Sequence, residues 1–274
     1  MKNIAFGQYY PANSLIHRMD PRAKALMALF YIICTFLCKN FLSFGVLIAS
    51  CLLLILLARL PVKLVLGTLK PLLVILLFTS AINIFLTKGE HLLTPAHWRV
   101  QIYEEGIWNA VFMMLRIVAL LASTEVFLTL TTTPIELTDA LEALMKPLKL
   151  ICFPVHDITM IITIALRFIP TLMEETQKIM NAQKARGADF QSGGLLKRAK
   201  ALLPVFIPLL GSAFKRADEL ANAMDCRCYH GGEGRTKLKV LHLRSSDVVA
   251  VVLVICLGVG VFFLNRLGIG YTMK

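Results

Sequence analysis

The stretch FLSFGVLIASCLLLILL, residues 41–57, carries no charged side chain and is apolar along almost its whole length. Outward from it, similar stretches lie at 25–38, 71–86, 107–130 and 248–264. A helix needs about 20 predominantly apolar residues to cross the hydrocarbon core of a bilayer, where its own hydrogen bonds satisfy the backbone. These stretches predict an all-α integral membrane protein with about five transmembrane helices.

The composition of the whole chain supports this class. Hydrophobic residues make up 57% of the sequence and charged residues 17%, whereas soluble domains average about 45–50% and about 25%. The net charge of +12 does not indicate a nucleic-acid partner, because lysine and arginine collect in the cytoplasmic loops of membrane proteins. We therefore expect the chain to lie in a lipid bilayer and to bind no nucleic acid.

The distribution of lysine and arginine predicts the orientation in the membrane. Four precede the first apolar stretch and three lie between the second and third, whereas the loop before the fourth has two, mixed with three glutamates. The positive-inside rule then places the N-terminus and the 59–70 loop in the cytoplasm and the C-terminus outside. The first 20 residues lack the apolar region of a signal peptide, so the first span is expected to act as the targeting element.

Three segments follow from this pattern. Residues 1–132 are expected to form a membrane domain with spans one to four, and 248–274 the final span with a C-terminal tail. Between them, 133–247 carries sixteen lysine and arginine residues and is expected to be cytoplasmic.

The 133–247 segment is predicted to contain one short and two long amphipathic helices. Thr133, Pro134 and Glu136 match a capping box with proline at the first helical position. Apolar residues recur at helical spacing over 158–179 and again over 195–227, where two prolines predict a bend. An alternative is that the two long helices lie flat on the membrane surface.

The two long helices end in similar sequences, NAQKARG at 181–187 and NAMDCRC at 222–228. Arg186 and Arg227 occupy matching positions, 41 residues apart. A basic residue in the last turn also stabilises the helix dipole, and this is the simpler interpretation of either arginine alone. The matching contexts favour docking on a cytoplasmic protein, because the planar guanidinium can pair bidentately with a partner's carboxylate.

Two ionisable residues lie inside the fourth apolar stretch, Arg116 and Glu125. Such groups are costly in a bilayer and usually face a bundle interior or a cavity, so a substrate or proton pathway is one interpretation. They are nine residues apart, point to nearly opposite sides of a helix and cannot pair with each other. The alternative is that Arg116 pairs elsewhere in the bundle and that Glu125 lies near the cytoplasmic end.

The remaining motifs indicate no chemistry within this chain. The glycines at 231–234 do not match a phosphate-binding loop, and no arrangement of catalytic Ser, His, Asp or Cys residues stands out. Cys226 and Cys228 are followed by His230, but they lack the second ligand pair of a metal site. We expect no catalytic residue, no metal site and no cofactor bound by the chain itself.

Several stretches together resemble the transmembrane (T) component of energy-coupling factor (ECF) transporters, the EcfT/CbiQ family. They are LIHRMDPRAK at 15–24, TTTP at 131–134, LRFIP at 166–170, ARG at 185–187 and AMDCRCY at 223–229. The resemblance covers essentially the whole chain. Within it, Asp20, Pro21 and Arg22 are interpreted as a helix cap and a basic anchor, or as a contact to another cytoplasmic element.

The resemblance implies a non-enzymatic scaffold in a prokaryotic cell membrane. Short Ala-Arg-Gly-type motifs at the ends of its coupling helices dock in grooves on two ATP-binding-cassette (ABC) ATPases, which bind ATP and Mg²⁺. The scaffold also holds a small S component that binds a vitamin or a metal ion, and it passes ATP-driven motion on to that subunit. The ATPase-coupling residues are then Ala185, Arg186, Gly187, Cys226, Arg227 and Cys228.

The second motif departs from the family pattern, because Cys228 stands where glycine is expected. Cysteine lacks the freedom of glycine for positive φ, so we expect the second long helix to end differently, near Gly231. The difference between the motifs also suggests two different ATPases.

Two rival functions would require other sequence patterns. A self-contained secondary transporter would need several ionisable or broken spans around a midplane site. A membrane enzyme acting on lipids would need clustered acidic or histidine residues, and His156 with Asp157 is the only adjacent pair.

Overall fold

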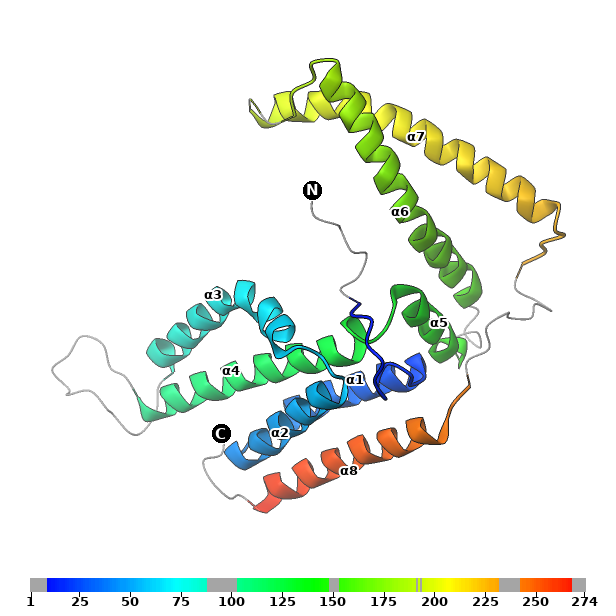
Figure 1. Cartoon of the computed structure of the whole chain (residues 1–274). Coiled ribbons are helices and arrows are strands. Elements are labelled where there is room, and N and C mark those ends of the chain that lie inside the picture. Colours follow the sequence, from blue (N-terminus) through cyan, green and yellow to red (C-terminus); the bar gives the residue numbers. More distant parts are fainter. Residues whose placement is uncertain are drawn as a thin grey trace. The chain divides into compact units, whose positions relative to one another are not determined.

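The structure is a computed structural model that describes residues 9–87, 103–147, 153–190, 192, 194–231 and 242–267. Within these residues the regular secondary structure is helical, which confirms the all-α prediction. The helices are α1 (Pro21–Leu37), α2 (Phe41–Leu57), α3 (Val62–Leu86), α4 (Glu104–Thr124), the π-helical turn η1 (Glu125–Thr129), α5 (Pro134–Leu144), α6 (Val155–Ala185), α7 (Leu195–Asp225) and α8 (Ser245–Leu267) (Figure 1).

The chain divides into two compact units. The first contains residues 1–140 and 240–274, and the second contains residues 141–239. The first unit therefore holds α1 to α4, η1, most of α5 and α8, and the second holds α6 and α7. The segment boundaries at 132 and 247 that we expected from the sequence stay a prediction.

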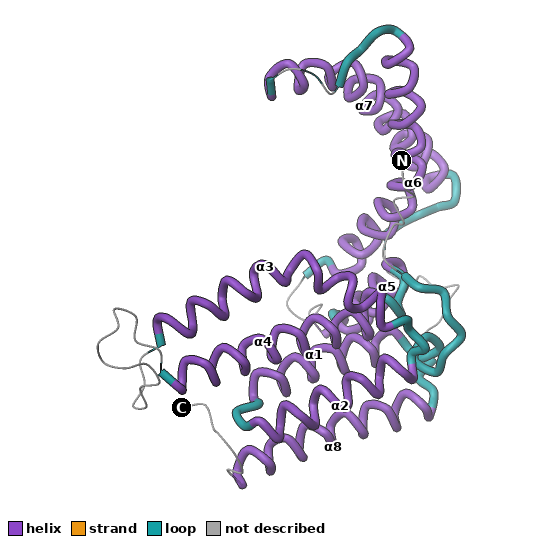
Figure 2. Tube along the Cα trace, turned by 60° about the vertical axis from the view of Figure 1, so that its left-hand side comes forward, coloured by secondary structure: helices purple, strands orange, loops and turns teal. Residues whose placement is uncertain are grey.

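In the first unit, α1 and α2 each pack against both α4 and α8, and α3 packs along α4 (Figure 2). The core between these helices is aromatic at its centre, where Tyr31, Phe44 and Phe112 are fully buried. Gly258 lets α8 approach α1 closely, since an added Cβ would come within 2.6 Å of the Phe30 ring.

A tight turn joins the first two helices. α1 ends at Leu37 and α2 begins at Phe41, and the Tyr31 hydroxyl of α1 donates to the Leu47 carbonyl of α2 at 2.6 Å. Asn265 of α8 closes the turn. Its side-chain oxygen accepts from Ser43 Oγ at 2.8 Å, and its amide donates to the Leu37 carbonyl at 2.7 Å.

The predicted start of the third span is wrong. We expected the helix to begin at Pro71 after a basic loop, but α3 begins at Val62 and contains Pro71 in its interior, with Lys63 and Lys70 also helical. An internal proline removes one backbone hydrogen bond and bends a helix without necessarily ending it, and Figure 1 shows α3 as a bent helix. Because proline is common at the first position of a helix, the sequence placed the start of this helix at Pro71 instead of Val62.

Four helices in the described residues are long and apolar enough to cross a membrane: α3, α4 with η1, α6 and α8. The apolar helix α2 is shorter, with 17 residues. These findings support a multi-pass membrane protein. α6 was predicted to be a cytoplasmic amphipathic helix, so its presence in this set differs from expectation. Its most apolar window has a mean hydropathy of 1.4, the lowest of the four.

Candidate functional site

The C-terminal end of α6 holds the first predicted docking arginine. Arg186 caps the helix, and Gly187 follows it with a φ of +87°. The Gly187 amide donates to the Lys184 carbonyl at 3.0 Å, and the Ala188 amide donates to the Gln183 carbonyl at 3.0 Å. This pair of bonds is a Schellman motif, which satisfies the last carbonyls and reverses the chain. The prediction that Gly187 ends the helix is confirmed.

The C-terminal end of α7 repeats this geometry. The Cys228 amide donates to the Asp225 carbonyl at 2.9 Å, and the Tyr229 amide donates to the Met224 carbonyl at 3.1 Å. Cys228 has a φ of +56° and occupies the position that Gly187 has in the first motif. The expectation that α7 ends differently, near Gly231, is therefore wrong, because the two hydrogen bonds hold cysteine in the left-handed region.

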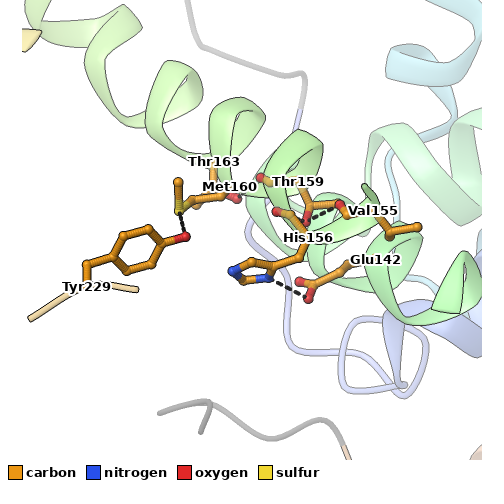
Figure 3. Close-up of polar contacts among 7 residues, drawn as sticks. All are labelled: Glu142, Val155, His156, Thr159, Met160, Thr163 and Tyr229. Atoms are coloured by element: carbon orange, nitrogen blue, oxygen red, sulfur yellow. Dashed lines mark hydrogen bonds and ion pairs between the residues drawn. The ribbon is translucent and has the colours of Figure 1, made fainter. Parts of the chain in front are cut away.

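The two motifs lie toward opposite ends of one helix pair. α6 and α7 pack against each other and cross in Figure 1. In this pair, Arg216 Nη2 donates to Glu175 Oε2 at 2.6 Å. The Tyr229 hydroxyl, just after α7, lies 3.0 Å from Met160 Sδ in the first turns of α6 (Figure 3). The end of α7 therefore lies beside the start of α6, whereas Arg186 lies at the far end of α6.

The separation of the two arginines follows from the length of α6. Ile164 of α6 lines the same pocket as Arg227. Because an α-helix rises 1.5 Å per residue, the stretch from Ile164 to Arg186 is roughly 33 Å long. Arg186 and Arg227 are both exposed, and in the described part of the chain neither makes an ion pair.

The surroundings of Arg227 form an open pocket with a volume of about 600 Å³ between α6 and the end of α7. Arg167 of α6 lines it together with Arg227, and the half-buried Phe168 and Met224 give it apolar walls. None of the described residues that line it is Asp or Glu. Arg167 belongs to the LRFIP stretch at 166–170, but the sequence alone predicted no role for it.

The start of α6 is held to the end of α5 by polar contacts. His156 Nδ1 lies 3.5 Å from Glu142 Oε1, and the Thr159 hydroxyl donates to the Val155 carbonyl at 2.9 Å (Figure 3). α5 itself begins with the predicted capping box, which is confirmed. The Glu136 amide donates to Thr133 Oγ1 at 3.3 Å, and the Thr133 amide donates to Glu136 Oε2 at 3.4 Å.

A buried lysine joins two of the stretches that carry the family resemblance. Lys24 is fully buried, and its Nζ donates to the Thr131 carbonyl at 2.8 Å and to the His17 carbonyl at 3.3 Å. Asp20 caps α1 by accepting from the Arg22 amide at 2.8 Å, which confirms the predicted cap. Sequence reasoning missed Lys24, because a cation beside a helix start usually indicates a solvated anchor.

The segment before α1 is ordered around His17. Its Nε2 lies 2.9 Å from the Tyr10 carbonyl, and its Nδ1 lies 2.7 Å from Ser14 Oγ. Burial lowers the pKa of His17, so the ring is neutral at pH 7. The neutral ring then donates from Nε2 and accepts at Nδ1, which ties residues 10–17 together above the buried Lys24.

Arg116 of α4 forms a hydrogen bond with the end of α1. Its Nη2 donates to the Cys38 carbonyl at 3.2 Å, and its guanidinium carbon lies 5.7 Å from the centre of the Phe44 ring. A cation at the C-terminal end of α1 also complements the helix dipole. Glu125 begins η1, and its Oε2 is buried without a hydrogen-bond partner in the described residues. A pathway role for these two residues stays a hypothesis.

In the described part of the chain, no three His, Cys, Asp or Glu side chains lie close enough to hold a metal ion. Cys226, Cys228 and His230 all lie in that part and form no such group. The two thiols are exposed, so the second motif has an arginine between two small, exposed side chains.

Comparison with known proteins identifies the family. Residues 12–238 match the CbiQ family model, described as cobalt transport protein. The chain is 49% identical over 266 residues to the energy-coupling factor transporter transmembrane protein EcfT of Acidaminococcus fermentans, covering 97% of this chain and 98% of the relative. It is 47% identical to the EcfT of Clostridium kluyveri (91% and 92% covered) and 44% identical to that of Bacillus subtilis (97% and 99%).

The chain belongs to the CbiQ/EcfT family of transporter transmembrane proteins. Both arginine motifs and the buried Lys24 lie inside the matched range, whereas α8 lies beyond it. Membership in EcfT confirms the resemblance found in the sequence, and it establishes a multi-pass membrane component of a transporter.

The strained Cys228 gives a direct test of the second motif. Replacing Cys228 with glycine should stabilise the end of α7 by about 1 kcal/mol, because a left-handed residue with a Cβ costs about 1–2 kcal/mol. Hydrogen–deuterium exchange should then slow over residues 222–229. Cys226→Gly is the matched control, since Cys226 caps α7 with a right-handed φ of −60°, and there exchange should become faster. Faster exchange in Cys228→Gly would contradict the assigned geometry.

Proposed function

We propose that this chain is the coupling subunit of an ECF-type ABC importer. Two cytoplasmic ATPases, which bind ATP and Mg²⁺, engage Arg186 and Arg227. The helix pair passes their motion to a small membrane S component that binds a vitamin or a metal ion, and the chain itself catalyses no reaction. The observation that carries this proposal is the repeated helix ending, which presents one exposed arginine at each end of a single α6–α7 pair.

The spacing of the two arginines supports two separate docking sites. Roughly 33 Å is about the diameter of a small domain, so one narrow groove on one protein does not accommodate both. The two helix endings share their backbone geometry and differ in the small side chains beside the arginine, Ala185 and Gly187 against Cys226 and Cys228. This difference favours two different ATPases.

An exposed apolar stripe on α7 supports a membrane partner. Leu203, Phe206, Ile207, Leu210 and Phe214 recur at helical spacing and are all exposed. A contiguous apolar face of this kind marks a contact with another protein or with lipid. In the proposed importer the stripe lies against the S component, and the charged helix ends reach the ATPases.

The cytoplasmic position of α6 and α7 is part of the proposal. Although α6 is apolar enough to span, Arg167 lies in its apolar half, and Glu174, Glu175 and Lys178 follow in the other half. A charge at the centre of a bilayer is costly, and the apolar run is shorter than the whole helix. We place the N-terminus in the cytoplasm and the C-terminus outside by the positive-inside rule.

The exposed thiols at the end of α7 allow a topology test. A membrane-impermeant maleimide should label Cys226 and Cys228 in inside-out vesicles and not in right-side-out vesicles, because the helix end is expected in the cytoplasm. A Cys226→Ser/Cys228→Ser variant is the control that assigns the signal to these two thiols. Equal labelling from both sides would contradict the proposed placement.

The principal alternative is a self-contained secondary transporter. It predicts buried charges arranged around a midplane site, but Arg116 is bonded to the end of α1. The two functions differ in what the chain needs: the proposed subunit is inactive without partners, whereas a secondary transporter would take up substrate when reconstituted alone.

Co-purification tests the proposed function. The tagged chain should come out of its native host in mild detergent with two ABC-type ATPases and a small membrane protein. Reversing both charges in Arg186→Glu/Arg227→Glu should remove the ATPases, abolish uptake and leave the small membrane protein bound. Arg198→Glu is the control, because Arg198 is exposed in the first turn of α7 and the charge change is the same. A folded wild-type chain that comes out alone would favour the secondary transporter.

A further inference from the structure

The pocket beside Arg227 contains a second arginine, Arg167, for which docking of Arg227 alone gives no role. Arg167 comes from the N-terminal half of α6, and Arg227 comes from the end of α7. Both line the same open pocket of about 600 Å³. We call this space the two-arginine pocket.

Among the residues that the structure describes, no acidic side chain balances the charges in the two-arginine pocket. In the described residues neither Arg167 nor Arg227 has an ion-pair partner, and no acidic residue lines the pocket. The same two helices do neutralise Arg216, which donates to Glu175 Oε2 at 2.6 Å. Two uncompensated guanidinium groups on one cavity attract an anion and favour a partner of opposite charge.

The walls of the two-arginine pocket indicate more than a small anion. Ile164, Phe168, Leu220 and Met224 are half-buried and line it together with the arginines. An inorganic phosphate would use the charges and leave this apolar surface in water. A peptide segment that carries an apolar side chain beside carboxylates would contact both the arginines and the apolar walls. Protein interfaces often have such an apolar centre together with arginine.

We propose that the two-arginine pocket receives an acidic segment of one ATPase, with its carboxylates on Arg167 and Arg227 and an apolar side chain against Phe168 and Met224. This inference rests on the proposed function and adds Arg167 as a second docking residue at the α7 end. The segment's acidic and apolar chemistry then selects which of the two ATPases binds there.

A photo-cross-linker placed in the pocket identifies its occupant. Thr163 lines the two-arginine pocket and is half-buried, so Thr163→p-benzoylphenylalanine in the full chain should cross-link to one ATPase, at a peptide rich in Asp or Glu. The same cross-linker at the exposed Lys197, in the first turn of α7, is the control and should not label that peptide. Cross-links to lipid or to the small membrane protein, or none, would overturn the proposal.

Substitution of Arg167 measures its contribution. Arg167→Gln should weaken binding of one ATPase about tenfold, since charge-assisted hydrogen bonds are lost, and Arg227→Gln should weaken binding of the same ATPase. The other ATPase should stay bound. Arg198→Gln is the control, because it removes the same positive charge outside the pocket. Size-exclusion profiles that match the wild type establish that the variants fold.

The outcomes separate this inference from the proposed function. If Arg167→Gln retains both ATPases at wild-type affinity while Arg227→Gln loses one, the two-arginine pocket is not a docking site and the proposed function stands. If the wild-type chain binds no ATPase, the proposed function fails and this inference fails with it.

Discussion

The left-handed residue that follows Arg186 and Arg227 is the constraint on which the proposed function depends. The chain reverses at Gly187 and Cys228 with the same two hydrogen bonds, so each arginine lies just beyond the end of its helix and directly before the left-handed residue. This geometry exposes the guanidinium and leaves the last carbonyls satisfied. Glycine adopts it without strain, whereas cysteine is held there against its own preference, so the backbone geometry of the motif does not require glycine.

The packing of α6 on α7 places two similar helix ends at separate positions on one helix pair. The Arg216–Glu175 ion pair and the Tyr229–Met160 contact set the helices side by side with the end of α7 near the start of α6. In the proposed function, this helix pair carries motion from its two ends to the apolar face of α7. Within the first unit, the buried Lys24 fixes residues before α1 to the turn after η1, which gives the membrane helices a defined cytoplasmic edge in the proposed orientation.

The sequence predicted what depends on local chemistry. The capping box at Thr133 and the glycine after Arg186 act within a few residues, and the structure confirms both. The apolar stretches predicted a multi-pass membrane protein, which the helices support, although α6 joined the set of helices long enough to span. The start of the third span was wrongly predicted at Pro71, because a proline that is typical of a helix start can also lie inside a bent helix. The shared pocket of Arg167 and Arg227 brings together two residues that are 60 positions apart in the sequence, and no local sequence pattern predicts that packing.

Native mass spectrometry of the solubilised complex, with each arginine reversed singly, tests the central claim most directly. The account predicts a wild-type complex that contains two different ATPases. Arg186→Glu should remove one of them and retain the other, and Arg227→Glu should show the opposite loss, because each helix end serves its own partner. Loss of the same ATPase in both variants, or an unchanged complex in both, would contradict the claim that the two arginines are separate docking sites.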